Sequence, residues 1–92
     1  MREQVLEAEV IARGIRTAPA GTRRAFNAMT GEWQQPGNKS FAWAGAEQAV
    51  MRFPNLVEHA VMRLGRQRNP RSSYRLTDLG LAVRRILEDQ TP

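Results

Sequence analysis

The sequence lacks cysteine, has a single histidine and contains no long apolar run. Without cysteine there is neither a disulfide framework nor thiol chemistry. His59 has no cysteine and no acidic pair near it in the sequence, so no metal site and no cofactor are expected. No apolar run approaches the roughly 18 residues of a membrane-spanning helix, and the N-terminal residues lack the apolar core of a signal peptide. We therefore expect a cytoplasmic protein that does not contact a membrane.

The residue patterns of catalytic sites are also missing. The serine and threonine residues have only one histidine to pair with, and their spacing suggests no catalytic triad. No pair of carboxylates suggests acid–base catalysis, and Gly31 and Gly37 do not form a phosphate-binding loop pattern. An enzyme is therefore not expected.

Acidic residues are absent from one stretch of the chain. None lies between Glu58 and Asp78, and residues 59–77 contain five arginines: Arg63, Arg66, Arg68, Arg71 and Arg75. The whole chain has 14 basic and 9 acidic residues, a net charge of +5, so this segment accounts for all of the excess. Localised basicity is typical of a surface that binds a polyanion. The alternative is that the arginines only solvate a loop.

Hydrophobic periodicity predicts a mostly α-helical domain with a small β-hairpin. Val5, Ala8, Ile11, Ala12 and Ile15 share one face of a first helix. In the first half of the chain we expect a helix at 3–16, a second helix capped by Thr22, a loop at 31–39, a short strand at 40–43 and a helix at 44–53.

The second half of the chain contains clearer boundary signals. Asn55 and Glu58 have the spacing of a capping box, which predicts a helix at 55–64 with Gly65 as its C-cap. Two short strands around a tight turn are expected over 66–76. Thr77 is a suitable N-cap for a last helix at 78–88.

The segment "YRLTDLG" resembles the junction between wing and helix in winged helix-turn-helix regulators of the MarR and PadR kind. Tyr74, Leu76, Thr77 and Gly80 match the pattern Tyr-x-Leu-Thr-x-x-Gly of those families. The likeness is closest over residues 72–87, and over 44–71 it extends to the order of elements. It implies one winged-helix domain over residues 1–92, with 55–64 as the recognition helix and 66–76 as the wing.

The resemblance implies a protein that binds double-stranded DNA, as a transcriptional regulator or an architectural factor. The expected DNA-binding residues are Asn55, His59, Arg63, Arg66, Arg68, Arg71 and Arg75. Arginine suits phosphate contacts because of its planar, permanently charged fork. Glu58 and Met62 stand where base-reading side chains are expected, which favours an alternative: a protein-interaction module that uses the same scaffold to bind a partner protein.

Three apolar residues of the terminal helices lie away from the main apolar faces: Leu6, Val10 and Leu81. Single exposed apolar residues are ordinary. Together, however, these positions suit a shared interface, and the resemblance implies dimers with the terminal helices at the interface. A homodimer is therefore one expected assembly of this protein.

Overall fold

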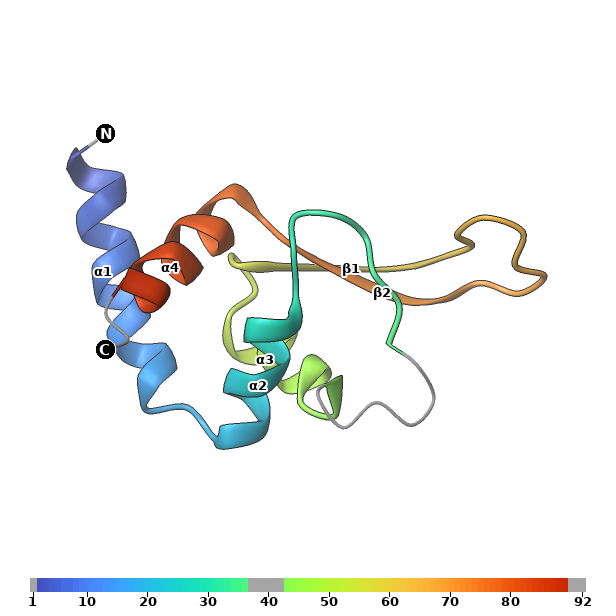
Figure 1. The fold of residues 1–92 in the computed structure, drawn as a ribbon, viewed down its shortest axis with the longest axis horizontal. Coiled ribbons are helices and arrows are strands. Elements are labelled where there is room, and N and C mark those ends of the chain that lie inside the picture. The colour runs from blue at the N-terminus through green and yellow to red at the C-terminus, as the bar shows by residue number, and fades with distance from the viewer. Residues whose placement is uncertain (1, 37–42, 90–92) are drawn as a thin grey trace.

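The computed structural model describes residues 2–36 and 43–89, which form four helices and one two-stranded antiparallel sheet (Figure 1). The elements are α1 (Arg2–Arg16), α2 (Ala20–Ala28), α3 (Ala46–Arg52), β1 (Val57–Met62), β2 (Arg71–Leu76) and α4 (Asp78–Asp89). The hairpin of β1 and β2 extends away from the helices, and the molecule measures 44 × 27 × 22 Å. No helix in the described ranges has the length and apolarity needed to cross a membrane.

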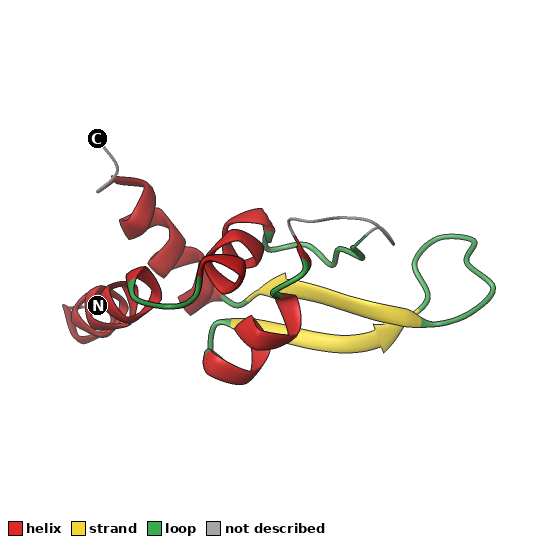
Figure 2. Ribbon diagram, turned by 90° about the horizontal axis from the view of Figure 1, so that it is seen from below, coloured by secondary structure: helices red, strands yellow, loops and turns green. Residues whose placement is uncertain are grey.

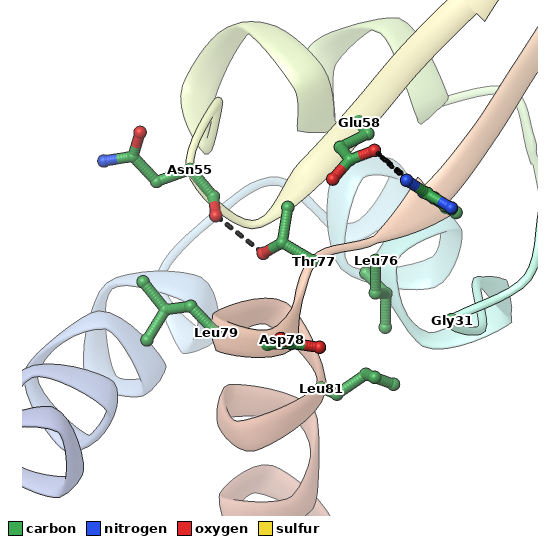
Figure 3. Close-up of a pocket in the computed structure, with 9 residues that line it drawn as sticks. Gly31, Asn55, Glu58, Leu76, Thr77, Asp78, Leu79 and Leu81 are labelled. Carbon is green, nitrogen blue, oxygen red and sulfur yellow. Dashed lines mark hydrogen bonds and ion pairs between the residues drawn. The ribbon is translucent and has the colours of Figure 1, made fainter. Parts of the chain in front are cut away.

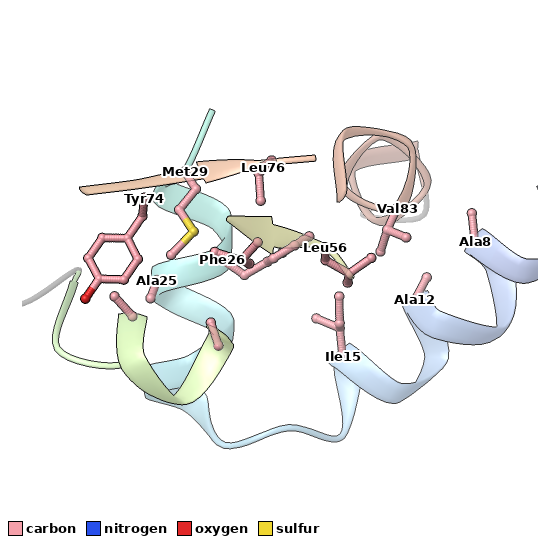
Figure 4. Close-up of a cluster of buried hydrophobic side chains, with 13 residues drawn as sticks. Ala8, Ala12, Ile15, Ala25, Phe26, Met29, Leu56, Tyr74, Leu76 and Val83 are labelled. Carbon is pink, nitrogen blue, oxygen red and sulfur yellow. The ribbon is translucent and has the colours of Figure 1, made fainter. Parts of the chain in front are cut away.

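The two terminal helices pack against each other and close one end of the core (Figure 4). Ala8, Ala12 and Ile15 of α1 are buried, as the periodicity predicted. The two alanines leave room for Val83 of α4, which is completely buried. The core continues through Phe26 and other side chains to the base of the hairpin.

The second helix begins earlier than expected. Pro19 precedes the first turn of α2 with φ −55° and ψ 148°, and Thr22 is buried inside the helix. The predicted Thr22 cap is therefore wrong, because proline already sets the extended backbone from which the helix starts. Helix α3 lies within the expected range 44–53. Of the expected strand 40–43, residues 40–42 lie outside the described part, and Trp43 begins a short helical turn.

The predicted recognition helix at 55–64 is wrong, because most of this segment is strand β1. Every residue from Val57 to Met62 has a partner in β2, in a register that runs from Val57–Leu76 to Met62–Arg71. The apolar residues of "VEHAVM" fit a helical stripe as well as a strand, and pairing with β2 decides between the two. Val61, which the helix would have turned inward, is 63% exposed.

Of the two strands predicted over 66–76, the second is confirmed as part of β2 and the first is wrong. Residues 66–68 lie in the loop 63–70 that joins β1 to β2, so the hairpin starts at Val57 rather than at Arg66. Gly65 does not cap a helix. It takes a positive φ of 61° within this loop, a backbone conformation that glycine adopts without a steric penalty.

A third segment lies along the other side of β2. The backbone N–H and C=O of Tyr74 both bond to Gln34, at 2.9 Å each, and the N–H of Leu76 donates to the carbonyl of Thr30 at 2.7 Å. Strand β2 therefore lies between β1 and the segment 30–34. Gln34 supplies this additional extended pairing.

The junction between β2 and α4 is as predicted. The N–H of Gly80 donates to Thr77 Oγ1 at 3.0 Å, which is the geometry of a helix N-cap. The Thr77 hydroxyl also donates to the carbonyl of Asn55 at 2.7 Å. At Gly80, a Cβ atom would lie 2.2 Å from the Leu56 carbonyl oxygen, so only glycine allows α4 to approach this turn so closely.

Candidate functional site: the basic hairpin

The candidate site is the hairpin over residues 57–76, which we call the basic arm. Its loop, residues 63–70, lies at the end of the molecule away from the helices (Figure 2). Arg63, Arg66 and Arg68 are exposed on this loop. No acidic residue occurs from 59 to 77, so the positive charge at this end is not offset by any neighbour in the sequence. The structure thus places three of the predicted DNA-binding residues together.

Arg71 and Arg75 also belong to the arm, but both make contacts within the chain. The Arg71 guanidinium donates to the Pro36 carbonyl at 2.9 Å. Arg75 forms an ion pair with Glu58, its partner in the strand register, at 2.8 Å. Its guanidinium also lies 4.5 Å from the centre of the Trp33 ring. These two arginines therefore anchor the arm to segment 33–36.

The Glu58–Arg75 pair changes the electrostatic character of the site. Glu58 was expected on a recognition helix, where its charge would repel phosphate. It instead pairs with an arginine, and both side chains are about two-fifths exposed (38% for Arg75 and 42% for Glu58). An exposed pair of this kind contributes little to stability by itself. Its main effect is to neutralise the base of the arm, so that the uncompensated charge lies toward the loop.

Asn55 and His59 occupy different places from those expected. Asn55 is exposed in the turn before β1, at the base of the arm, and its backbone carbonyl accepts the bond from Thr77. His59 is exposed on β1, and its ring lies 5.0 Å from the ring of Tyr74. Tyr74 is in turn 6.0 Å from Trp43. His59 thus ends a row of aromatic rings on one face of the hairpin.

A cluster of glutamines joins the loop to the segment beside β2, and sequence reasoning missed it. The Gln35 side-chain amide donates to the carbonyl of Met62 and to Ser73 Oγ, both at 3.1 Å. Gln67 donates to Gln35 and accepts from the backbone N–H of Leu64 at 2.9 Å. Gln35 and Gln67 are 32 positions apart, and no local pattern indicates such a contact. These bonds hold the start of the loop in place.

Tyr74 is the only group in the arm with a resolved change in its acid–base behaviour. Burial raises the pKa of Tyr74 above 10.0, the negative charge of Glu47 raises it further, and a hydrogen bond with Ser72 opposes the shift. The phenol therefore remains neutral at physiological pH. Its role is to pack between the arm and the helical body, where it is 4% exposed.

A pocket lies at the base of the arm (Figure 3). It has a volume of about 480 Å³, and Leu76, Leu79 and Leu81 form its apolar lining. The charged residues that line it are Glu58 and Arg75, which pair with each other, and Asp78, in the first turn of α4. Within residues 2–36 and 43–89, no group of three or more histidine, cysteine or acidic residues could hold a metal ion.

The three residues expected at a dimer interface differ in their surroundings. Val10 is 65% exposed on α1. Leu81 is half-buried against the core and packs on Gly31, where a Cβ atom would lie 3.2 Å from its side chain. Leu6 lies in α1, but its side chain is outside the described part. Of Val10 and Leu81, Val10 therefore offers the larger exposed fraction to another molecule.

Comparison of the chain with models of protein families, with curated proteins and with solved structures finds no match.

Proposed function

We propose that this protein binds double-stranded DNA through the basic arm, as a transcriptional regulator or an architectural factor. The observation that carries the proposal is the exposure of Arg63, Arg66 and Arg68 on a loop that extends from the body, with no acid from 59 to 77. Phosphate contacts dominate the affinity of proteins for DNA, and arginines supply them.

The arrangement of the helices supports a winged helix-turn-helix scaffold. Two packed helices, α2 and α3, precede the hairpin, and α4 follows it. In this proposal the hairpin is the wing, and α3 replaces the segment 55–64 as the helix that enters the major groove. Gln48 and Arg52 are exposed on α3. Glutamine and arginine are suited to hydrogen bonding with base edges.

The internal contacts of the arm favour a rigid wing. Arg71, Arg75 and the glutamine cluster tie the strands and the start of the loop to segment 33–36. An arm that is held in position before binding loses less conformational entropy when it meets the DNA backbone. These contacts support the loop and leave the side chains of Arg63, Arg66 and Arg68 exposed.

The test is a titration of the protein with unrelated DNA duplexes at several salt concentrations. The slope of log K against log salt is negative, and each arginine lost from a phosphate contact makes it less steep by about 0.9. Replacing Arg63, Arg66 and Arg68 by glutamine should therefore reduce the magnitude of the slope by up to ~2.7. The loss of affinity should be similar on all duplexes, because phosphate contacts carry no sequence information.

The matched control is a triple replacement of Arg13, Arg16 and Arg23 by glutamine. These arginines are also exposed, but they lie on α1 and α2, and their loss removes the same charge. We expect this variant to keep nearly the parent slope. Equal slopes in the two triple variants, or no binding of the parent protein at low salt, would contradict the proposal.

A further inference from the structure

Among the residues that the structure describes, the backbone groups on the outer edge of β1 have few partners. In an antiparallel pair, residues that face each other either exchange two hydrogen bonds or none, in alternation. Tyr74 uses both of its backbone groups on Gln34, so it exchanges none with His59, its partner in the register. Val61 lies two residues further along β1, opposite Ser72, so its backbone groups point in the same direction as those of His59. The N–H and C=O groups of His59 and Val61 therefore point away from β2.

This edge is uncovered in the part of the chain that the structure describes. The bond from the N–H of Val57 to the carbonyl of Phe53 covers only the start of β1. Beyond it, His59 and Val61 are both exposed. Proteins usually protect such edges with charges, prolines or bulges. From His59 to Met62 the strand has no aspartate, glutamate, lysine or arginine, and it has no proline.

We propose that the outer edge of β1 binds an extended acidic segment of another protein, which adds to the sheet as a further strand. His59 and Val61 offer two donors and two acceptors, and main-chain bonds of this kind supply the affinity in strand addition. The exposed Val61 side chain offers an apolar contact to the added strand. This binding mode does not depend on the proposed binding of DNA.

The positive charge next to the edge of β1 favours an acidic segment as the added strand. Strand β1 leads directly into Arg63, Arg66 and Arg68, and no acid lies between 59 and 77. A strand that carries carboxylates would therefore meet opposite charges where it passes the end of β1. A second copy of this chain is a poorer occupant, because it carries the same arginines and a net charge of +5.

The probe is a short peptide of alternating valine and glutamate, blocked at both ends, added to the ¹⁵N-labelled protein. Saturating peptide should slow amide hydrogen exchange at His59 and Val61 about tenfold or more, because each gains a hydrogen bond. Ala60 and Met62 already bond to β2 and should change little. Two control peptides should bind about tenfold more weakly: one N-methylated at alternate backbone nitrogens, the other with lysine in place of glutamate.

Three outcomes would overturn the proposal. The first is no binding of the acidic peptide. The second is binding that leaves the exchange of His59 and Val61 unchanged, or that the N-methylated peptide reproduces, which would mean attraction to the arginines alone. The third is protection of these two amides that rises with protein concentration when no peptide is present, which would identify a second copy as the occupant.

A pair of variants at Val61 tests the same edge from the side of the protein. Val61→Pro removes the outward N–H, and proline is tolerated at edge positions whose N–H faces solvent. Val61→Ala trims the side chain and keeps the N–H. We expect about a tenfold loss of peptide affinity for Val61→Pro and a clearly smaller loss for Val61→Ala. Equal losses would contradict strand addition, and the N-methylated peptide decides the matter if proline disturbs the hairpin.

Discussion

Thr77 connects three segments of the chain through one hydroxyl group. Its oxygen accepts the N–H of Gly80 in the first turn of α4, and its proton goes to the carbonyl of Asn55 in the turn before β1. The backbone N–H of Thr77 also bonds to the carbonyl of Leu56, at 2.9 Å. The base of the arm is therefore fastened to the last helix at a single residue.

Replacement of Thr77 by alanine should lower the free energy of unfolding by roughly 0.5–2 kcal/mol, because it removes the N-cap of α4. Thr77→Ser is the matched control, since serine keeps the hydroxyl and should retain most of the stability. Urea denaturation followed by circular dichroism measures both variants. A serine variant as unstable as the alanine variant would assign the effect to the lost methyl group instead.

Tyr74 should make the stability of the protein depend on alkaline pH. Its pKa in the folded protein is raised above 10.0 by burial and by Glu47, so folding favours the neutral phenol. This contribution is complete below pH 10 and is lost as the pH rises from 10 through the folded pKa, because the unfolded chain ionises first.

Tyr74→Phe removes the ionisable group, so the fall in stability above about pH 10 should be smaller in this variant. Denaturant titrations of both proteins from neutral to alkaline pH measure the difference. Tyr74 is the only tyrosine, so tyrosinate absorbance reports its ionisation directly. An absorbance midpoint at or below 10 in the folded protein would contradict the shift.

Among the elements, the approach of α4 to the turn before β1 depends on Gly80. A Cβ atom there would lie 2.2 Å from the backbone oxygen of Leu56, which cannot turn aside as a side chain would. Gly80→Ala should therefore destabilise the protein, by roughly 1–3 kcal/mol, as overpacking does elsewhere.

The control for Gly80 is Gly14, near the end of α1, where a Cβ atom would meet nothing within 4 Å. Gly14→Ala should stabilise the protein by roughly 0.5–1 kcal/mol, because alanine loses less backbone entropy in a helix. Thermal denaturation of the two variants should give shifts of opposite sign. Stabilisation by Gly80→Ala would show that the two segments separate easily.

Helices α1 and α4 could be predicted from the sequence because helical periodicity and capping are local properties. The apolar face of α1, the Thr77 cap and the range of α4 all followed from neighbouring residues. Strand β1 could not be predicted in the same way, because "VEHAVM" also fits a helical stripe and its pairing partner lies beyond an eight-residue loop. In that segment non-local pairing outweighed the local pattern.

In the candidate site, too, the local features could be predicted from the sequence and the contacts between distant segments could not. The gap in acidic residues identified the basic segment from the sequence alone. Which arginines make contacts within the chain could not be predicted, because the partners of Arg71 and Arg75 include Pro36 and Trp33 from a distant part of the chain. The glutamine cluster escaped prediction for the same reason.

At the scale of the whole molecule, we propose that α1 pairs with a second copy through Val10, which is 65% exposed. Val10→Glu should then shift the protein toward monomer without loss of helicity, because a buried charge at an interface is far more costly than an exposed one. Sedimentation velocity over a range of concentrations measures the shift.

Val61→Glu is the control for Val10→Glu, because Val61 is about equally exposed, at 63%, but lies on the hairpin. This variant should leave an α1-mediated dimer intact. If it dissociates the dimer while Val10→Glu does not, the interface lies at the edge of β1. A parent protein that remains monomeric at high concentration would exclude the dimer altogether.

The two tryptophans provide separate optical signals from the two faces of the hairpin. Tyr74 and Arg75 are consecutive in β2, so their side chains point to opposite faces. Trp33 lies beneath the guanidinium of Arg75, and Trp43 lies beside Tyr74. In a variant that keeps only one indole, fluorescence then reports one face at a time. A ligand that displaces Arg75 should change the emission of Trp33. A ligand that binds against the rings of His59 and Tyr74 should change the emission of Trp43.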